Sequence, residues 1–279
     1  MIFIPDAVID ALIAEDVPYI DLTTHLLDIG SREGEMAYFT REDAVLCGTE
    51  EVRRILERFH LSVTFSLPSG SAVEAGQTFL RAAGKAEALH MAWKVCQTIF
   101  EYCSGIATKT RKMVELARRE NPHVSIVTTR KSFPGTKALA IKAVIAGGAM
   151  PHRLGISETI LVFEQHMKFL GGLQGFLKQV PELKQKACEK KLIVEAHSVE
   201  DGLLLLKAGV DGLQLDKLSP AVLKEAVPRL REANPGAVLL AAGGITEQRV
   251  AEYARTGVDA LVTTSVYQAK PLDIGVRMK

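Results

Sequence analysis

The second half of the chain alternates short apolar runs with segments of helical pattern, and this alternation constrains the fold most strongly. Six largely apolar runs of four or five residues occur at 125–129, 160–163, 192–196, 212–215, 237–241 and 260–263. Continuous apolar strands separated by helices are typical of a parallel sheet that is covered on its faces. We therefore expect an α/β fold in which six parallel strands form an open, TIM-like barrel. A doubly wound open sheet is the alternative.

The segments between these runs carry helix start and stop signals. Ser198, Ser219 followed by Pro220, and Thr246 stand where a helix N-cap is expected. Gly209 and Gly257 stand where a helix C-terminus favours a left-handed residue. These signals support repeated βα units.

The first part of the chain mixes element types. A helix is expected from Thr49 to Phe59, and a long helical stretch over 85–119 is interrupted near Ser104 and Gly105. Short β-like runs occur at 36–40, 44–47, 61–67 and 78–82. We predict an N-terminal α+β sandwich domain over 1–106, joined by the C-terminal tail 268–279, and a catalytic barrel domain over 107–267.

Composition excludes several classes of protein. The chain has 34 basic and 33 acidic residues among 279, so no overall charge favours nucleic acid or an anionic membrane. The N-terminus lacks the basic region of a secretory signal, and no apolar run reaches the length of a membrane span. The cysteines form no CxxC motif, which favours reduced thiols in a cytoplasmic protein. The histidines show no HxH or HExxH spacing, so a transition-metal site is not expected.

Charged side chains follow the predicted strands, at the rim where barrel enzymes keep their active sites. The cationic side chains are Arg130, Lys131, Lys137, His152 and Arg153, and the acidic ones are Glu195 and Asp216. Arginine forks suit carboxylates or phosphates, and two carboxylates suit Mg²⁺, directly or through water. A single such residue is commonly a solvated or salt-bridged surface group. Several strand ends with compatible charges favour a site.

Backbone groups at the last two strand ends favour a phosphate. Gly243 and Gly244 are followed by a predicted capped helix, whose free N–H groups and positive dipole end suit an anion. The last strand ends at Thr263, Thr264 and Ser265. Phosphate sites recur after the last two strands of barrels.

Ordered motifs along nearly the whole chain resemble those of the quinolinate phosphoribosyltransferase family, also called nicotinate-nucleotide pyrophosphorylases. They are EDVPYIDLTT at 15–24, SGIATKT at 104–110, TTRKSFPG at 128–135, GGAMPHRLGISE at 147–158, VEAHS at 194–198, LQLDK at 213–217, AAGGIT at 241–246 and GVDALVTTS at 257–265. Within the family the sequence is most similar to the ModD proteins, named for molybdenum transport, with which it shares AWKVCQTIFEYCSGIAT at 92–108.

The resemblance implies an N-terminal α/β sandwich, a six-stranded open barrel and a homodimer or larger oligomer with active sites shared between subunits. Arg130, His152 and Arg153 would bind the acceptor's carboxylate, and Lys131 would contact acceptor or donor phosphate. The donor would be phosphoribosyl pyrophosphate (PRPP). Glu195 and Asp216 would bind its ribose and Mg²⁺. Its 5′-phosphate would be bound by Gly243, Gly244 and Thr264.

The chain departs from the family where cations are expected. The family's Glu-Arg pair reads Trp93-Lys94, and its lysine in the motif LIKDNH is Phe163. On the helix after TTRK, a lysine is replaced by Ile141 and an arginine by Lys137, and the serine before Gly243 is Ala242. Each lost charged hydrogen bond costs about 1 to 3 kcal/mol. We therefore expect quinolinate to be a poor acceptor and a less anionic or more apolar heteroaromatic ring to face Phe163.

Three other readings remain open. The first is authentic quinolinate phosphoribosyltransferase of NAD biosynthesis, in which Lys94, Lys137 and Lys142 replace the missing cations. The second is a non-catalytic barrel that binds phosphate or an oxyanion connected with molybdenum uptake. The third is a Schiff-base enzyme using Lys131, for which the sequence offers no apolar surroundings. Catalysis requires Glu195 and Asp216, whereas an anion binder needs only the cationic residues.

Overall fold

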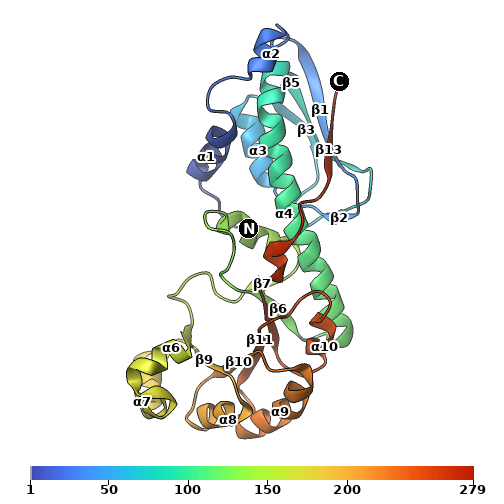
Figure 1. Cartoon of the computed structure of the whole chain (residues 1–279). Helices are drawn as coiled ribbons and strands as arrows, with labels where there is room; N and C mark the ends of the chain where they lie inside the picture. The colour runs from blue at the N-terminus through green and yellow to red at the C-terminus, as the bar shows by residue number, and fades with distance from the viewer. Residues whose placement is uncertain (1) are drawn as a thin grey trace. The chain divides into compact units, whose positions relative to one another are not determined.

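The structure, a computed structural model that describes residues 2–279, divides the chain into two units built from separate stretches of sequence (Figure 1). The first unit comprises the chain up to Arg111 together with Ser132–Gly148 and Val266–Lys279. The second comprises Lys112–Lys131 and Ala149–Ser265. Ser132–Gly148, which the sequence analysis placed within 107–267, thus belongs to the first unit. Within residues 2–279, no helix combines the length and apolarity that crossing a membrane requires.

The first unit contains an antiparallel sheet in the order β13-β1-β5-β3. Its strands are β1 (Glu33–Thr40), β3 (Ser62–Ser66), β5 (Thr78–Lys85) and β13 (Ile274–Met278). A second, two-stranded sheet pairs β2 (Ala44–Val45) with β4 (Ala72–Val73). The β-like runs expected from the sequence all overlap strands, whereas β4 and β13 were not expected. β13 brings the end of the chain onto β1, where Tyr38 pairs with Val276.

The helices of the first unit are α1 (Asp6–Asp16), α2 (Leu22–Leu26), α3 (Thr49–Arg58), α5 (Lys137–Ala146) and α4 (Ala86–Glu120), which continues into the second unit. The expected interruption of α4 at Ser104 and Gly105 is wrong, because the helix is continuous there. A Cβ atom on Gly105 would lie 2.4 Å from the carbonyl oxygen of Lys270. The glycine therefore admits the C-terminal segment against the helix.

A buried ion-pair cluster joins α5 to α3. The Lys142 Nζ lies 2.5 Å from a carboxylate oxygen of Glu50 and 2.5 Å from one of Glu51. The side chains of Lys142 and Glu51 are only 9% and 3% exposed. Two carboxylates therefore compensate a single lysine charge that has almost no access to water.

The second unit is built on a parallel sheet of seven strands in the order β7-β6-β12-β11-β10-β9-β8. The strands are β6 (Ser125–Thr128), β7 (Met150–Pro151), β8 (Ile160–Val162), β9 (Leu192–Ala196), β10 (Gly212–Asp216), β11 (Val238–Ala242) and β12 (Ala260–Thr263). All six expected strands form. The expected number is nevertheless one too low, because β7 has only two residues, one of them proline, and forms the edge beside β6.

The sheet curls into a half-barrel with an apolar interior. A Cβ atom on Gly212 of β10 would lie 2.4 Å from the Val238 carbonyl oxygen on β11 and 2.9 Å from the Ile193 side chain on β9. Backbone and side-chain atoms of the two flanking strands thus occupy the space beside this glycine. A cluster of buried residues from β8, β9, β11 and β12 lines the interior: Leu161, Ile193, Leu240, Ala242, Ala260 and Val262.

The helical segments of the second unit are α6 (Glu164–Met167), the 3₁₀ turns η1 (Lys168–Leu170) and η2 (Ser265–Gln268, which ends in the first unit), α7 (Gly172–Lys186), α8 (Val199–Lys207), α9 (Pro220–Ala233) and α10 (Val250–Ala254). The Ser198 and Ser219 hydroxyls accept hydrogen bonds from the backbone N–H groups of Asp201 and Val222, as expected for N-caps. The expected helix after Thr246 is wrong in extent, because α10 begins only at Val250.

Candidate active site

The carboxyl ends of the parallel strands carry the candidate side chains in a fixed order. From one edge of the sheet to the other, the strand order places His152 and Arg153 after β7, Arg130 and Lys131 after β6, Thr264 after β12, Gly243 and Gly244 after β11, Asp216 on β10, Glu195 on β9 and Phe163 after β8. Cationic groups therefore occupy one side of the rim, and the carboxylates and an aromatic ring occupy the other. Hydroxyl and backbone groups lie between them.

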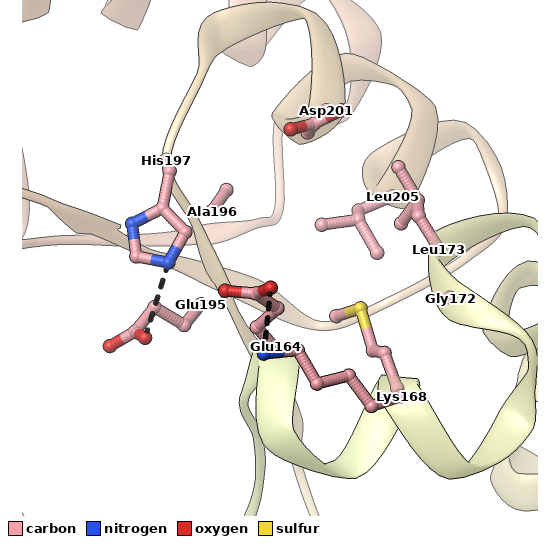
Figure 2. Close-up of a pocket in the computed structure, with 10 residues that line it drawn as sticks. Glu164, Lys168, Gly172, Leu173, Glu195, Ala196, His197, Asp201 and Leu205 are labelled. Carbon is pink, nitrogen blue, oxygen red and sulfur yellow. Dashed lines mark ion pairs between the residues drawn. The ribbon is translucent and has the colours of Figure 1, made fainter.

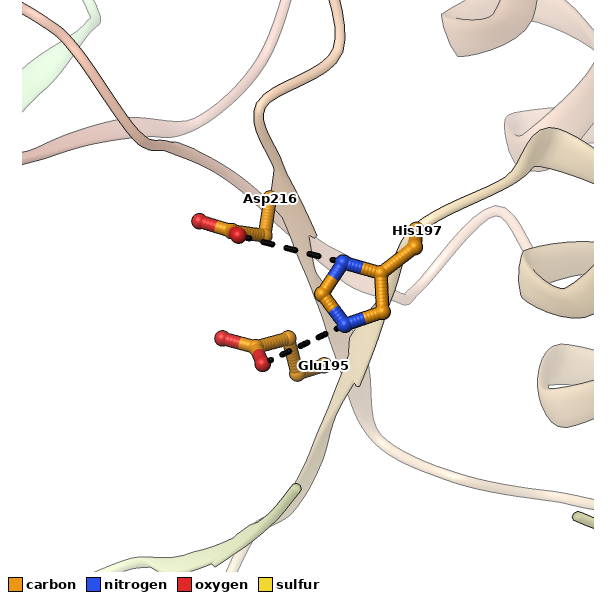
Figure 3. Close-up of side chains that lie close together, drawn as sticks. All are labelled: Glu195, His197 and Asp216. Atoms are coloured by element: carbon orange, nitrogen blue, oxygen red, sulfur yellow. Dashed lines mark ion pairs between the residues drawn. The ribbon is translucent and has the colours of Figure 1, made fainter. Parts of the chain in front are cut away.

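Glu195 and Asp216 are brought together, and His197 lies between them (Figure 3). The imidazole Nε2 is 3.6 Å from Glu195 Oε1, and Nδ1 is 3.8 Å from Asp216 Oδ2. The two carboxylate side chains are 14% and 16% exposed, whereas His197 is 50% exposed. The histidine thus covers a pair of acids on the side of the solvent.

The surroundings of Glu195 make its ionised form costly. Burial raises the pKa of this carboxyl above its usual value, and the nearby charge of Asp216 adds to the rise. A hydrogen bond donated by Gln214 Nε2 at 2.9 Å opposes the change and fixes the carboxylate's orientation. Two half-buried acids side by side repel each other, so this arrangement favours a bound cation.

The described acids fit Mg²⁺ on the chemistry of the donor set. Glu195 and Asp216 each offer a carboxylate oxygen, and Mg²⁺ commonly takes one or two carboxylates beside waters and substrate phosphates. The cation nearest to Asp216 is Lys217, whose Nζ is 3.7 Å away and whose side chain is 80% exposed. Lys217 therefore leaves much of the local negative charge uncompensated.

A pocket of about 270 Å³ opens beside Glu195. Figure 2 shows Glu195 and His197 on one side of it and Leu173 and Leu205 on the other, with Asp201 at the start of α8. Glu164 and Lys168 of α6 and η1 pair across 3.3 Å at its margin. The pocket therefore combines an acidic wall with an apolar one.

The cationic groups also converge. His152 is held next to β6 by a hydrogen bond from its backbone N–H to the Thr128 carbonyl oxygen at 2.9 Å. Burial lowers the pKa of Arg153, and the charge of Arg130 lowers it further. Burial also lowers the pKa of His152, with the charge of Arg153 contributing. A guanidinium group whose charge is disfavoured by burial and by a second guanidinium nearby suits an anion between them.

The glycine pair after β11 supplies backbone rather than a helix end. Gly243 and Gly244 have φ angles of 90° and 70°, a left-handed conformation that favours glycine. A Cβ atom on Gly243 would lie 2.9 Å from the Lys217 nitrogen and 3.0 Å from Asp216 Oδ1. The expected dipole contribution is wrong, because α10 is short and begins beyond this turn. Nearby, the hydroxyls of Thr264 and Thr129 are 2.9 Å apart.

Phe163 and the candidate lysines have different surroundings. Phe163 is packed against the apolar interior and stacks on His166, with ring centroids 5.8 Å apart. Lys94 and Lys137 belong to the first unit, where Lys137 begins α5 and Lys94 lies over the Trp93 ring at 4.5 Å. Lys142 is committed to Glu50 and Glu51.

Sequence reasoning gave no role to two groups around the two acids, His197 and Gln214. A signal was present in the spacing, because side chains two residues apart on a strand point to the same side. Glu195 and His197 have this spacing, as do Gln214 and Asp216. Strand register then sets Gln214 opposite Glu195.

Comparison with known proteins gives a consistent result. The family model for the quinolinate phosphoribosyl transferase N-terminal domain matches residues 21–104, and that for the C-terminal domain matches residues 106–277. A protein of Escherichia coli O157:H7 named "Putative pyrophosphorylase ModD" is 36% identical, over 100% of this chain and 98% of its own.

Two further relatives extend the comparison. A protein of Archaeoglobus fulgidus named probable nicotinate-nucleotide pyrophosphorylase (carboxylating) is 30% identical, over 94% of this chain and 99% of its own. The structure of the nicotinate-nucleotide pyrophosphorylase from Francisella tularensis matches with a TM-score of 0.90 at 24% identity, covering 100% of this chain and 98% of that one. The structural likeness establishes the shared fold.

Proposed function

Because the chain belongs to the quinolinate phosphoribosyltransferase family, an enzyme family of pentosyltransferases, we propose that it transfers phosphoribose from PRPP to a ring nitrogen of a heteroaromatic acid. The order of groups along the strand ends is the observation that carries this proposal. A bisubstrate reaction between two anionic molecules needs separate anion sites and a place for a cation, and the rim offers all three. Gly243, Gly244 and Thr264 lie between the cationic and acidic sides and bind the 5′-phosphate.

The residues of the acidic side hold the reacting ribose and the pyrophosphate. Asp216 and Glu195 would hold Mg²⁺, directly or through water, and would accept hydrogen bonds from the ribose hydroxyls. Mg²⁺ neutralises charge on the departing pyrophosphate when it is bound there. Lys131 adds a positive charge for acceptor or donor phosphate. The site works by alignment and electrostatic stabilisation, since a ring nitrogen already carries the lone pair that attacks C1.

Arg130, His152 and Arg153 bind the acceptor's carboxylate, and the rest of the acceptor site distinguishes this chain. Phe163, packed on the apolar interior, stands where the family has a lysine. Lys142, a candidate substitute, is neutralised by Glu50 and Glu51. A second acceptor carboxylate would meet an aromatic ring at Phe163 in place of a cation, so we propose that the acceptor is not quinolinate. A monocarboxylate ring with an apolar edge fits better.

Calorimetric titration with PRPP tests the donor site. We expect binding that requires Mg²⁺ and is lost in Asp216→Ala, because the variant removes a cation ligand. Glu200→Ala, which removes an exposed acid of α8, serves as the matched control and binds like the wild type. Absence of binding to the wild-type protein would leave only an anion-binding barrel.

Competition between acceptors tests the second part. Wild-type protein is expected to turn over quinolinate poorly, and Phe163→Lys is expected to raise kcat/KM for quinolinate while lowering it for monocarboxylate rings. A wild-type rate with quinolinate that is normal for biosynthetic enzymes contradicts the proposal and supports the role in NAD biosynthesis.

Self-association is part of the same proposal, with active sites shared between subunits of a homodimer. Apolar side chains near the start of the chain are well exposed, including Tyr19 at 90% and Leu26 at 73%. Several exposed large apolar side chains in one short stretch of sequence favour a partner surface. Light scattering is expected to give a dimer mass for the wild type and a monomer mass for Tyr19→Ser combined with Leu26→Ser.

A further inference from the structure

Three potential metal ligands meet at neighbouring strand ends. Glu195 and His197 are two residues apart along β9 and its end, and Asp216 ends β10. Pairing of Leu215 with Ala196 continues the register so that Asp216 comes opposite His197. The three side chains are therefore carried by two paired strands of a buried parallel sheet, a rigid support.

The ligand atoms have separations suited to one ion. One nitrogen of His197 and one oxygen from each carboxylate lie within 4.8 Å of one another. Atoms that share an ion at about 2.0–2.2 Å lie roughly 3 to 4 Å apart. Because Nε2 of His197 faces Glu195 and Nδ1 faces Asp216, the ring must turn to bring one nitrogen towards both carboxylates. Figure 3 shows the His197 ring between the two carboxylates, and its side chain is 50% exposed, which leaves space on the solvent side for the ring to turn. Gln214 meanwhile fixes Glu195 from the protein side.

We propose that Glu195, His197 and Asp216 together bind a divalent transition-metal ion, through one imidazole nitrogen and two carboxylate oxygens. This deepens the proposed function and rests on it for the use of the ion, which accompanies PRPP. The two carboxylates alone suit Mg²⁺, which prefers oxygen ligands. An imidazole ligand instead suits ions such as Co²⁺ and Zn²⁺, which bind nitrogen more strongly.

Titration of the full chain with Co²⁺ and with Mg²⁺, without PRPP and free of any affinity tag, tests the proposal. Wild-type protein is expected to bind Co²⁺ more tightly than Mg²⁺. His197→Ala is expected to weaken Co²⁺ binding by at least about tenfold, the size of losses from altered metal surroundings, and to change Mg²⁺ binding much less. Asp216→Asn is expected to weaken both.

His123→Ala is the matched control, because His123 is an exposed histidine that precedes β6, at the opposite end of the parallel strands. It is expected to bind both ions like the wild type. Pulsed electron paramagnetic resonance of bound Mn²⁺ provides a direct readout: nitrogen modulation in the wild type and in His123→Ala, and its loss in His197→Ala.

Unchanged Co²⁺ affinity or retained nitrogen modulation in His197→Ala would overturn the proposal, and so would equal affinity of the wild type for Co²⁺ and Mg²⁺. These measurements contain no PRPP. If His197→Ala leaves metal binding unchanged while the wild type binds PRPP with Mg²⁺, His197 is not a ligand but the proposed transferase function stands. If the wild type binds the metal ion but not PRPP, the proposed transferase function is contradicted.

Discussion

At Gly243 the backbone that follows β11 lies close to the end of β10. It has a left-handed φ, and the atoms that a methyl group added there would meet first belong to Lys217 and Asp216. Gly209, with a φ of 99°, has nothing within 4 Å of the same position. The two glycines therefore separate conformational strain from steric overlap.

Gly209→Ala is expected to cost about 1 kcal/mol of unfolding free energy, and Gly243→Ala about 1 to 3 kcal/mol more because of overlap. Only Gly243→Ala should also weaken PRPP binding, since it displaces Asp216. Chemical denaturation and calorimetry check both effects. Equal costs at the two positions would show that Asp216 and Lys217 yield without resistance.

Glu50 makes the ion-pair cluster sensitive to acid. Burial acts to raise the pKa of this carboxyl, but hydrogen bonds from Lys142 and Ser69 outweigh it and bring the pKa from 4.5 to about 2. A depressed pKa contributes stability above the unfolded value, and that contribution is lost as the pH falls from 4.5 towards 2.

Denaturation from about pH 5 to about pH 2.5 is therefore expected to show a smaller loss of stability in Glu50→Gln than in the wild type. Glu15→Gln, at an exposed position of α1, should follow the wild-type curve. If the Glu50→Gln curve also follows the wild-type curve, protonation of Glu50 does not cause the loss of stability in acid.

The active-site residues were predictable to different degrees. Arg130, Glu195 and Asp216 follow strands that the sequence makes plain, so their shared rim could be expected. His197 could not be assigned from histidine spacing, because its neighbours in the cluster are carboxylates, one of them 19 positions along the chain on another strand. The engagement of Lys142 with Glu50 and Glu51 likewise depends on contacts between distant segments.

Among the elements, α4 contains a glycine, Gly105, whose presence is explained by a tertiary contact and not by helix propensity. Glycine within a helix weakens it when nothing else acts, and replacement by alanine then stabilises by about 0.5 to 1 kcal/mol. At Gly105 the Lys270 carbonyl occupies the space that a methyl group needs. Backbone atoms cannot rotate away as a flexible side chain can.

Gly105→Ala is therefore expected to destabilise the protein by about 1 to 3 kcal/mol, the opposite sign from helix propensity. Thermal and denaturant unfolding measure it. A stabilised variant would mean that the C-terminal segment does not rest on the helix in solution.

The strands and helices of the second unit were largely predictable because their apolar runs are continuous and their caps are local. Ser198 and Ser219 act within three residues. β7 was not predicted because two residues are too few to show a periodic pattern, and only its pairing with β6 defines it as a strand. α10 starts later than predicted because the turn after Gly244 extends to Arg249. The Arg249 N–H donates a hydrogen bond to the Thr246 carbonyl oxygen at 3.1 Å.

At the scale of the whole molecule, the two ends of the chain belong to the same unit. β13 supplies an outer strand to β1, and its Ile274 is buried in that unit's core. Deletion of residues 274–279 is therefore expected to reduce amide protection in β1 while leaving β10 protected. Hydrogen exchange read by mass spectrometry distinguishes these strands. Equal loss in β1 and β10 would show that the two units unfold together.

The placement of β13 also sets an order of events at the ribosome. Every strand of the parallel sheet is synthesised before β13, so β1 waits through most of translation with one edge unpaired. An unpaired edge can template wrong associations between nascent chains. Synthesis of β13 therefore completes a sheet whose other strands were made much earlier, and a nascent chain that lacks β13 is expected to expose the unpaired edge of β1.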